Sequence, residues 1–541
     1  MQHQQVETRP YDDQRPGTAG LRRPVATFRQ PHYLENFLQS VFDIADLPDG
    51  ATLIAGGDGR HFNAEALQTL IRMAAANGVT RVIIGRDGLL STPAASHLIR
   101  HRRADGGFLL TASHNPGGPD GDFGIKFNVA SGGQASEALT EAIYARSRSI
   151  GAYRICTDLA VPPLDALGVH AFGDCVIEIV DPVSDYAALM QSLFDFDRIR
   201  ALLASGFRLH FDAMNAVTGP YARHIFCDLL GAPEGAVQRA TPLPDFGGLH
   251  PDPNPVEAPE LLRAAEATGG PDLIAASDGD GDRNMILGPG GLVHPCDSLA
   301  VLAAQHHRVP GYREGLPGVA RSMPTSRAID AVADALGIPC HVTPTGWRFF
   351  CNLLEDGQLG LCGEESFGTS SHHAREKDGL WAVLFWLDVL ADARRSIPEL
   401  LDAHWQRFGR HHYLREDWQI ADADAANALV EGLRAACTPG AAPPRGVHSM
   451  RDFAYEDPVD GSHSEHQGIE VLLDDGSRII YRLSGTGTRG ATLRVYLEQH
   501  VTAPEAIAQA SRNVLAALGH TAASLGRIEH YTGLSAPTLR V

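Results

Sequence analysis

The stretch GGFLLTASHNPGG, residues 106–118, begins as an apolar run and ends in a polar loop rich in glycine and proline. The same plan recurs in ATLIAGGDGR (51–60), FRLHFDAMNAVTG (207–219), PDLIAASDGDGDRNMIL (271–287) and LGLCGEESFG (359–368). Short apolar runs of this kind are typical of buried strands. Each predicted strand therefore ends in a loop whose polar residues are available for chemistry.

Helix-like segments lie between these runs. AEALQTLIRMAAANG (64–78) and TSRAIDAVADALG (325–337) repeat apolar residues at a spacing near 3.6, which predicts amphipathic helices. Alternating strands and helices indicate α/β units, in which ligand-binding loops lie beyond the carboxyl ends of the strands. We expect three α/β domains with one functional loop each.

The C-terminal part follows a different pattern. CTPGAAPPRG (437–446) predicts a linker or surface loop. Residues 468–500 alternate like an antiparallel hairpin, and APEAIAQASRNVLAALG (503–519) predicts one helix. A smaller α+β domain is therefore expected to close the chain.

Composition describes an ordinary globular protein with 44% hydrophobic and 20% charged residues. A chain of 541 residues is too long for one core, so three to four domains are expected. No apolar run reaches the ~18 residues that cross a bilayer, and the first residues show no secretory signal. The eight cysteines are scattered without a CxxC pair, which fits a reducing compartment without structural zinc. These features predict a cytoplasmic protein without a membrane partner.

The net charge of −20 argues against nucleic acid as a partner, because nucleic acids bind basic surfaces. An anionic substrate would need arginine and lysine residues concentrated at one place, against the overall charge. A local concentration of arginine and lysine residues therefore indicates a candidate site for an anionic substrate.

The segment DGDGDR, Asp278 to Arg283, is the strongest metal signal. Carboxylates at alternate positions separated by glycine can surround one cation, and ligands that are all oxygen suit Mg²⁺, Mn²⁺ or Ca²⁺ rather than zinc. An EF-hand would need glycine and glutamate where Arg283 and Pro289 stand, so that interpretation fails. An acidic solvated turn is the alternative. Arg283 beside three acids indicates a site that also receives a phosphate.

The segment RLSGTGTRGATLR (482–494) contains glycines in G-x-G-x-x-G spacing. A dinucleotide site would need a helix after the glycines, whereas ATLRVYLE alternates as a strand. We interpret the loop as an anion-binding site made of backbone N–H groups, hydroxyls and flanking arginines. A plain hairpin turn is the alternative. The residues involved are Arg482, Ser484, Gly485, Thr486, Gly487, Thr488 and Arg494.

A third loop, CGEESFGTSSHHAREKDGLW (362–381), offers Glu364, Ser366, Arg375 and Lys377. Carboxylates and a hydroxyl at a strand end are good partners for sugar hydroxyls. An ordinary polar loop would show similar residues.

Ser113 next to His114 invites a hydrolase interpretation, yet neighbours in sequence rarely face each other productively. The G-x-S-x-G motif is absent, since the stretch reads T-A-S-H-N. A serine can instead store a phosphoryl group. Beside a cation at Asp278, Asp280 and Asp282, a phosphoserine could transfer its phosphoryl group in line to a substrate hydroxyl. Two phosphate positions, one metal and one sugar-like site together describe a phosphosugar mutase.

The four loops TASHNPGG, DGDGDR, GEESFG and RLSGTGTRGATLR, in this order, resemble those of the α-D-phosphohexomutases, and GEESFG followed by REKDGLW resembles their glucose-specific branch. The resemblance covers essentially the whole chain. It implies three similar α/β domains with mixed sheets plus a smaller C-terminal α+β domain around a central cleft. The expected domain boundaries are 1–187, 188–292, 293–408 and 409–541.

The resemblance also implies roles for single residues. Ser113 would be the phosphoserine, and one Mg²⁺ would bind its phosphoryl oxygen together with the three aspartates. Glu364 and Ser366 would bind sugar hydroxyls, and the 482–494 loop would bind the substrate phosphate. His114 or Lys377 would be the general acid/base. Other substrate contacts are expected at Arg22, Arg283, Thr345 and Lys377.

The implied reaction interconverts α-D-glucose 1-phosphate and glucose 6-phosphate, with glucose 1,6-bisphosphate as intermediate and activator. Phosphomannomutase-type activity, a metal-dependent phosphatase and a non-catalytic phosphosugar-binding protein are the alternatives. The sequence departs from the family's usual pattern at Ala19, Arg348, His372 and Arg489, none of which has a role above. The partner is expected to be a small phosphosugar, and the chain a monomer or weak dimer.

Overall fold

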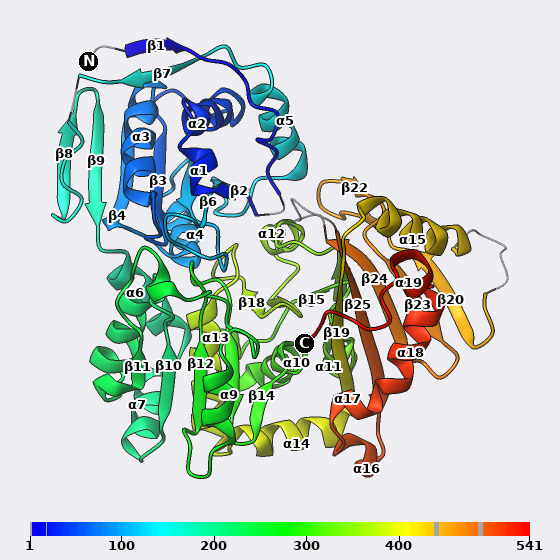
Figure 1. Cartoon of the computed structure of the whole chain (residues 1–541). Helices are drawn as coiled ribbons and strands as arrows, with labels where there is room; N and C mark the ends of the chain where they lie inside the picture. Colours follow the sequence, from blue (N-terminus) through cyan, green and yellow to red (C-terminus); the bar gives the residue numbers. More distant parts are fainter. Residues whose placement is uncertain (1–2, 18, 159, 438–442, 485–490) are drawn as a thin grey trace. The chain divides into compact units, whose positions relative to one another are not determined.

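The structure, a computed structural model, describes residues 3–17, 19–158, 160–437, 443–484 and 491–541 (Figure 1). Its residues group into two compact units. The first contains Met1–Pro295, Gln305–Pro317 and Gly346–Ile397, and the second contains Cys296–Ala304, Gly318–Thr345 and Pro398–Val541. Within the described parts of the chain, no helix is long and apolar enough to cross a membrane.

The first unit begins with a seven-stranded mixed sheet in the order β2-β6-β5-β3-β4-β9-β8. Neighbouring strands β9, β4, β3 and β5 are parallel, whereas β2, β6 and β8 pair antiparallel. A separate antiparallel pair joins β1 to β7. The strands are β1 (His3–Glu7), β2 (Leu21–Pro24), β3 (Thr52–Gly57), β4 (Arg81–Leu89), β5 (Gly106–Leu110), β6 (Asp122–Val129), β7 (Ala152–Cys156), β8 (Gly168–Phe172) and β9 (Cys175–Val180).

Helices cover both faces of this sheet. Apolar side chains of α2 (Tyr33–Ile44) and α3 (Asn63–Ala76) share one core with Leu53, Val82 and Phe108 of the strands. On the other face, α4 (Thr92–His101) packs against β3 and β5. Ser91 starts α4 by accepting a hydrogen bond from the Ala94 amide at 3.3 Å, which satisfies one unpaired donor of the first turn. The remaining helices of this region are α1 (Val25–Phe28) and α5 (Glu137–Ser147).

A five-stranded mixed sheet follows in the order β11-β10-β12-β13-β14, with β10 parallel to both neighbours. Its strands are β10 (Leu209–Asp212), β11 (Val237–Gln238), β12 (Leu273–Ala276), β13 (Met285–Gly288) and β14 (Gly291–Val293). The first unit ends with the antiparallel pair of β17 (Leu361–Glu364) and β18 (Gly368–Ser371). Helices of these regions are α6 (Pro182–Leu193), α7 (Phe196–Ala204), α8 (Thr218–Ala222), α9 (Pro259–Glu266), α12 (Arg348–Glu355) and α13 (Gly379–Ala393).

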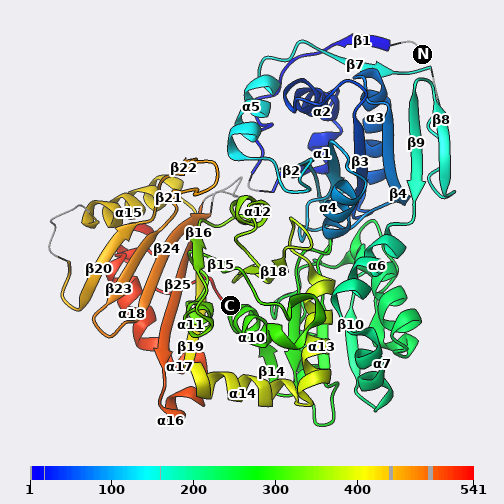
Figure 2. The same cartoon turned by 180° about the vertical axis from the view of Figure 1, so that it is seen from behind.

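The second unit is built on a six-stranded antiparallel sheet in the order β20-β23-β24-β25-β19-β26, most of which can be followed in Figure 2. One face shares a core with α15, α18 and α19, and the other packs on Cys296 and Met323. The parallel strands β15 (Val319–Ser322) and β16 (Cys340–Thr343) belong to this unit, with α11 (Ala328–Leu336) between them. Helices α10 (Pro295–Gln305) and α14 (Ile397–Phe408) lie at the points where the chain changes units.

The remaining elements of the C-terminal part confirm its antiparallel character. The predicted hairpin over 468–500 consists of three strands, β23, β24 and β25. Strands are β19 (Arg410–Ile420), β20 (Val447–Asp452), β21 (Tyr455–Glu456), β22 (His463–Ser464), β23 (Ile469–Leu473), β24 (Arg478–Ser484), β25 (Ala491–Val501) and β26 (Leu539–Arg540). Helices are α15 (Ala423–Ala436), α16 (Pro504–Ile507), α17 (Ser511–Val514), α18 (Ala516–Leu525) and α19 (Ile528–Thr532).

The single helix predicted over 503–519 is wrong, because the chain forms the short helices α16 and α17 before α18 begins. Ala510 is extended and interrupts the helical run. The carbonyls before this break accept hydrogen bonds from side chains of β19. Arg410 donates to Ile507 O at 2.6 Å, and His412 Nε2 lies 3.0 Å from Ala506 O, which also accepts from the Gln509 amide at 3.1 Å. Tertiary hydrogen bonds therefore hold the chain at this break.

Candidate active site

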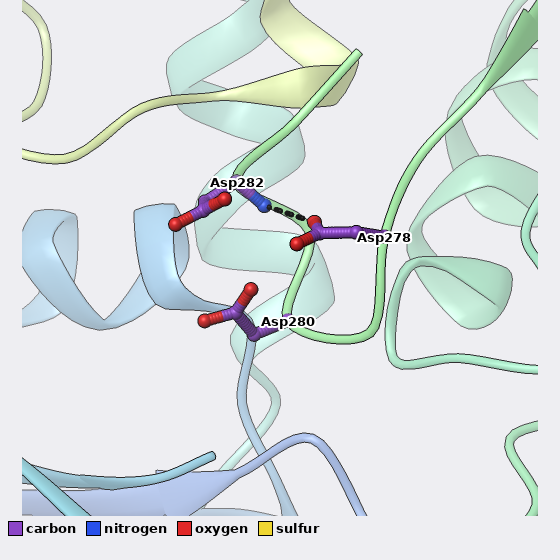
Figure 3. Close-up of side chains that lie close together, drawn as sticks. All are labelled: Asp278, Asp280 and Asp282. Atoms are coloured by element: carbon purple, nitrogen blue, oxygen red, sulfur yellow. Dashed lines mark hydrogen bonds between the residues drawn. The ribbon is translucent and has the colours of Figure 1, made fainter. Parts of the chain in front are cut away.

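Three carboxylates converge in the loop that follows β12 (Figure 3). Asp278, Asp280 and Asp282 are 0%, 1% and 2% exposed, and one oxygen from each lies within 4.8 Å of the others. The loop is held closed from within, since Asp278 Oδ1 accepts hydrogen bonds from the amides of Asp282 (3.0 Å) and Arg283 (3.1 Å). The predicted clustering of these aspartates is thus observed.

Glycine between the aspartates lets this loop approach the serine loop. A Cβ at Gly279 would lie 2.4 Å from the carbonyl oxygen of Ser113, which is closer than any side chain tolerates. The loop of aspartates therefore contacts the serine loop backbone to backbone. Gly279 makes that contact possible.

Two lysines face the carboxylates. Lys126 Nζ, on β6, lies 2.9 Å from Asp280 Oδ2 and 3.8 Å from Asp282 Oδ2. Lys377 Nζ lies 3.2 Å from Asp282 Oδ2. Thr92 Oγ1, at the start of α4, donates to Asp280 at 2.8 Å. Within the described part of the chain, the other oxygens of Asp280 and Asp282 are buried without a hydrogen-bond partner.

The proton affinities of these acids differ. Burial raises the pKa of Asp278 well above its usual range, and the neighbouring carboxylates of Asp282 and Asp280 raise it further. Burial also opposes ionisation of Asp280, but the charge and hydrogen bond of Lys126 lower its pKa below the usual range. Three buried carboxylates with unsatisfied oxygens fit a hard divalent cation, whose ligands are oxygens.

Ser113 lies directly against this acidic cluster. Its hydroxyl Oγ donates to Asp278 Oδ2 at 2.8 Å, and its side chain is buried. The residue has a φ of 53°, a left-handed conformation that serine rarely adopts. Its amide donates to Thr111 Oγ1 at 2.8 Å, which helps to hold this turn. His114 Nδ1 is 3.4 Å from Ser113 Oγ, a long contact for a hydrolase-type pair.

Arg60 holds the serine loop through hydrogen bonds to its backbone carbonyl oxygens. Its guanidinium donates to the carbonyl oxygens of Ser113 at 2.6 Å, Asp122 at 2.9 Å and Asn115 at 3.3 Å. It also forms an ion pair with Asp58 at 2.9 Å in which both side chains are fully buried. This pair follows β3, so the seven-stranded sheet supports the loop that carries Ser113.

Further cations lie around the cluster. Arg283 NH1 pairs with Asp252 at 3.0 Å. Burial lowers the pKa of Arg22, and the charges of Asp280 and Asp282 oppose this effect. Burial, followed by the charges of Arg283 and Arg22, lowers the pKa of His114 well below its ordinary value. The local concentration of positive charge expected for an anionic substrate is present.

The predicted sugar-binding residues lie at the turn between β17 and β18. Glu364 is 5% exposed, and its Oε1 accepts a hydrogen bond from the Gly346 amide at 3.0 Å. Burial raises the pKa of Glu364, and the charge of Lys377 opposes this effect. Ser366 is half-buried in the same turn. Thr345 precedes Gly346 and belongs to the second unit.

The predicted phosphate-binding loop, 482–494, includes the end of β24 and the start of β25. Arg482 and Arg494 face each other across these paired strands, and Ser484 ends β24. Arg494 Nε is 3.9 Å from Asp417. Four predicted residues, Gly485, Thr486, Gly487 and Thr488, lie outside the described residues, as does Arg489.

Sequence reasoning missed several residues that contact the predicted ones, chiefly Lys126, Arg60, Thr92 and Asp252. Lys126 is a charge within the apolar run of β6 and Arg60 follows a buried strand, and such isolated charges were the available signal. Their partners lie far away in the sequence, so their roles needed the fold.

Known proteins match the chain from end to end. A phosphoglucomutase of Rhizobium radiobacter is 52% identical over 99% of both chains, and phosphoglucomutase-1 of Bos taurus is 47% identical over 99% of both. The chain belongs to the phosphoglucomutase family. Profiles of phosphoglucomutase/phosphomannomutase domains I, II and III match residues 13–154, 184–291 and 295–408, and the phosphoglucomutase-1 C-terminal domain matches 410–538.

Solved structures of the phosphoglucomutase family share the fold. Parafusin from Paramecium, described as a phosphoglucomutase, has a TM-score of 0.92 and 43% identity, covering 100% of this chain and 99% of that one. A putative phosphomannomutase from Thermus thermophilus, at 21% identity and a TM-score of 0.68, covers 95% of this chain and 100% of that one and shares the fold. The predicted family and fold class, three α/β domains with mixed sheets plus a C-terminal α+β domain, are confirmed. The four domain boundaries stay a prediction.

Proposed function

We propose that this phosphoglucomutase interconverts α-D-glucose 1-phosphate and glucose 6-phosphate, as an isomerase that transfers a phosphoryl group through Ser113. One observation carries the proposal. The Ser113 hydroxyl donates at 2.8 Å to Asp278, within a buried cluster of three carboxylates, so a phosphoryl group on this oxygen would sit beside a cation site. Mg²⁺, one per chain, is the proposed ion, held by Asp278, Asp280 and Asp282.

The proposed reaction has two transfers. In the first, the bond from phosphorus to Ser113 Oγ breaks while the substrate O6 bonds to phosphorus, a base takes the O6 proton and an acid gives a proton to Ser113 Oγ. Glucose 1,6-bisphosphate results. After this intermediate turns over, the bond from phosphorus to O1 breaks while Ser113 Oγ bonds to phosphorus, the Ser113 proton passes to the base, O1 receives a proton and glucose 6-phosphate leaves. The bound ion supplies charge that stabilises the phosphoryl oxygens in the transition state.

Two groups stand as general acid/base, as the sequence predicts. His114 Nδ1 is 3.4 Å from Ser113 Oγ, and Lys377 Nζ is 3.2 Å from Asp282. The proposed substrate contacts are Arg22, Arg283, Thr345 and Lys377, and the residues of the 482–494 loop are the proposed partners of the substrate phosphate. Glu364 and Ser366 are the proposed partners of the sugar hydroxyls, which the burial of Glu364 beside Lys377 supports.

A coupled assay tests the activity. Glucose 6-phosphate formation is followed from glucose 1-phosphate with Mg²⁺, with and without glucose 1,6-bisphosphate. We expect turnover that the bisphosphate stimulates. Absence of turnover in both conditions would contradict the proposal, and release of free phosphate in place of isomerisation would indicate a phosphatase.

The glucose-specific assignment has its own support. The C-terminal match is to phosphoglucomutase-1, whereas the profiles of the first three domains include phosphomannomutases. Comparing kcat/KM for glucose 1-phosphate and mannose 1-phosphate decides between these substrates.

Several similar phosphoglucomutases are named as cytoplasmic and one as chloroplastic. We propose that this chain acts in the cytoplasm, as a monomer or weak dimer.

A further inference from the structure

Two fully buried carboxylates flank Lys377 in the sequence. Glu376 and Asp378 are both 0% exposed, whereas the Lys377 side chain between them is 13% exposed. Neither acid belongs to the aspartate cluster or has a role in the proposed phosphoryl transfers. Burying a carboxylate is costly unless its oxygens accept hydrogen bonds, so the partners of these two acids show what the burial achieves.

Each oxygen of Glu376 accepts a hydrogen bond from a side-chain amide. Asn128 Nδ2, on β6, donates to Oε1 at 3.0 Å, and Gln134 Nε2, in the segment after β6, donates to Oε2 at 2.9 Å. Lys126, which contacts Asp280, also exerts its charge on Glu376. The residue before Lys377 is therefore fastened to the sheet that carries the serine loop.

Asp378 is held by a different set of partners. Tyr186 OH, on α6, donates to Oδ1 at 2.6 Å, and the Trp381 amide donates to the same oxygen at 3.1 Å, which caps α13. His373 Nε2 lies 2.9 Å from Oδ2, and its Nδ1 lies 2.7 Å from Ser371 Oγ. The residue after Lys377 is thus fixed to α6, to α13 and to the end of β18.

The lysine side chain itself follows a defined path. A Cβ at Gly368 would lie 2.3 Å from Lys377 Cδ, so the lysine stem crosses the backbone of β18 at a position where only glycine leaves room. Its Nζ then ends 3.2 Å from Asp282. The amide of Gly379 donates to Gly281 O at 3.1 Å, which joins the start of α13 to the loop of aspartates.

We propose that Glu376 and Asp378 are positioning residues that hold the Lys377 ammonium at the reacting atoms. This inference rests on the proposed function, in which Lys377 contacts the substrate. Both acids act only through Lys377. Loss of either lets the lysine shift, and a shift of about 1 Å at a reacting group costs up to about 100-fold in rate.

A double-mutant cycle tests the proposal on the full chain. Glu376→Ala is expected to lower kcat about 10- to 100-fold with KM for glucose 1-phosphate changed less than about threefold. Glu376→Gln restores most of the loss, because a rotated Gln134 amide can accept from the new NH₂ group. In a Lys377→Ala background, Glu376→Ala is expected to change kcat less than about twofold, because no lysine is left to position.

A second pair of variants, Asp378→Asn and Asp378→Ala, tests the residue after Lys377. Asp378→Asn keeps Oδ1 for Tyr186 and Trp381, and His373 can accept from the new amide by moving its proton to Nδ1. We therefore expect Asp378→Asn to retain most of the wild-type kcat and Asp378→Ala to lose it. Gln134→Leu removes one bond to Glu376 without altering the lysine loop, and replaces Glu376→Ala in the cycle if that variant fails to fold.

Glu141 supplies a control, because this acid pairs with Arg15 at the surface, where the two side chains are 48% and 59% exposed. Glu141→Ala is expected to keep kcat within about twofold of wild type. Equal losses from Glu376→Ala with and without Lys377 would overturn the positioning role, as would wild-type kcat in Glu376→Ala. Wild-type kcat in Lys377→Ala would contradict the role of the lysine itself, and absence of wild-type turnover would contradict the proposed function.

Discussion

Replacing Arg60 by methionine tests how the loop that carries Ser113 is supported. The arginine pairs with Asp58 while both side chains are fully buried, and it donates to the carbonyl oxygens of Ser113, Asn115 and Asp122. Methionine retains much of the length but none of the donors. Asp58 would remain as a buried charge without its partner, which costs about 3–5 kcal/mol.

The expected size of the effect follows from this cost. With a urea dependence of about 2.5 kcal/mol per molar, a loss of about 3–5 kcal/mol shifts the unfolding midpoint of the region around β3 by about 1–2 M. Because the chain has several domains, the transition is followed by hydrogen exchange of amides in β3 and β5 rather than by one global signal.

A surface arginine provides the control. Arg200 pairs with Asp197 at 2.5 Å, but these side chains are 50% and 92% exposed. Exposed ion pairs contribute below about 1 kcal/mol, so Arg200→Met should leave the same amides unchanged. A midpoint for Arg60→Met that equals that of Arg200→Met would refute the claim that Arg60 supports the serine loop.

Three further changes have defined outcomes. Gly279→Ala places a Cβ 2.4 Å from Ser113 O, so we expect kcat to fall at least about 100-fold. Circular dichroism should show that the fold is retained. A near-normal kcat would mean that the loop of aspartates and the serine loop are not in contact. Asp280→Asn removes a buried acceptor of Lys126 and one carboxylate of the cluster, so Mg²⁺ titrated against activity should show at least about tenfold weaker binding. Burial raises the pKa of Asp297 to about 6, so stability should fall as pH rises from about 4 to 6, where the folded protein binds this proton more tightly than the unfolded chain. Asp297→Asn should remove this pH dependence. In urea unfolding, its free energy of unfolding should exceed that of wild type by up to about 3 kcal/mol at pH 7 and should equal it near pH 4. An equal gain at both pH values would contradict this cause.

The sequence allowed much of the α/β plan to be predicted, because its strands are short apolar runs that end in glycine-rich loops. The aspartate cluster was predicted for a physical reason as well. Three carboxylates separated only by glycine come together whenever the loop bends, and no distant residue is needed to gather them. The chemistry of phosphoryl transfer led us to expect Ser113 beside the cation site of the three aspartates, and in the structure Ser113 Oγ lies 2.8 Å from Asp278 Oδ2.

Features that depend on distant partners were not predictable. Lys126 is a single charge in an apolar run and Glu376 is one of four consecutive charged residues, and the positions of both are set by residues of other loops and strands. The predicted helix over 503–519 failed for the same reason, since Arg410 and His412 bond its carbonyls from β19. Propensity and periodicity describe neighbours in sequence, whereas these interactions join segments that the fold brings together.

The most direct test of the central claim follows a phosphoryl group on the enzyme. Wild-type protein is incubated with glucose 1,6-bisphosphate carrying radiolabelled phosphate, digested, and mapped for the labelled peptide. We predict that the label sits on Ser113, that Ser113→Ala takes up none, and that unlabelled glucose 1-phosphate chases the label into sugar phosphate. Label on another residue, or label on Ser113 that stays during turnover, would contradict Ser113 as the phosphoryl carrier.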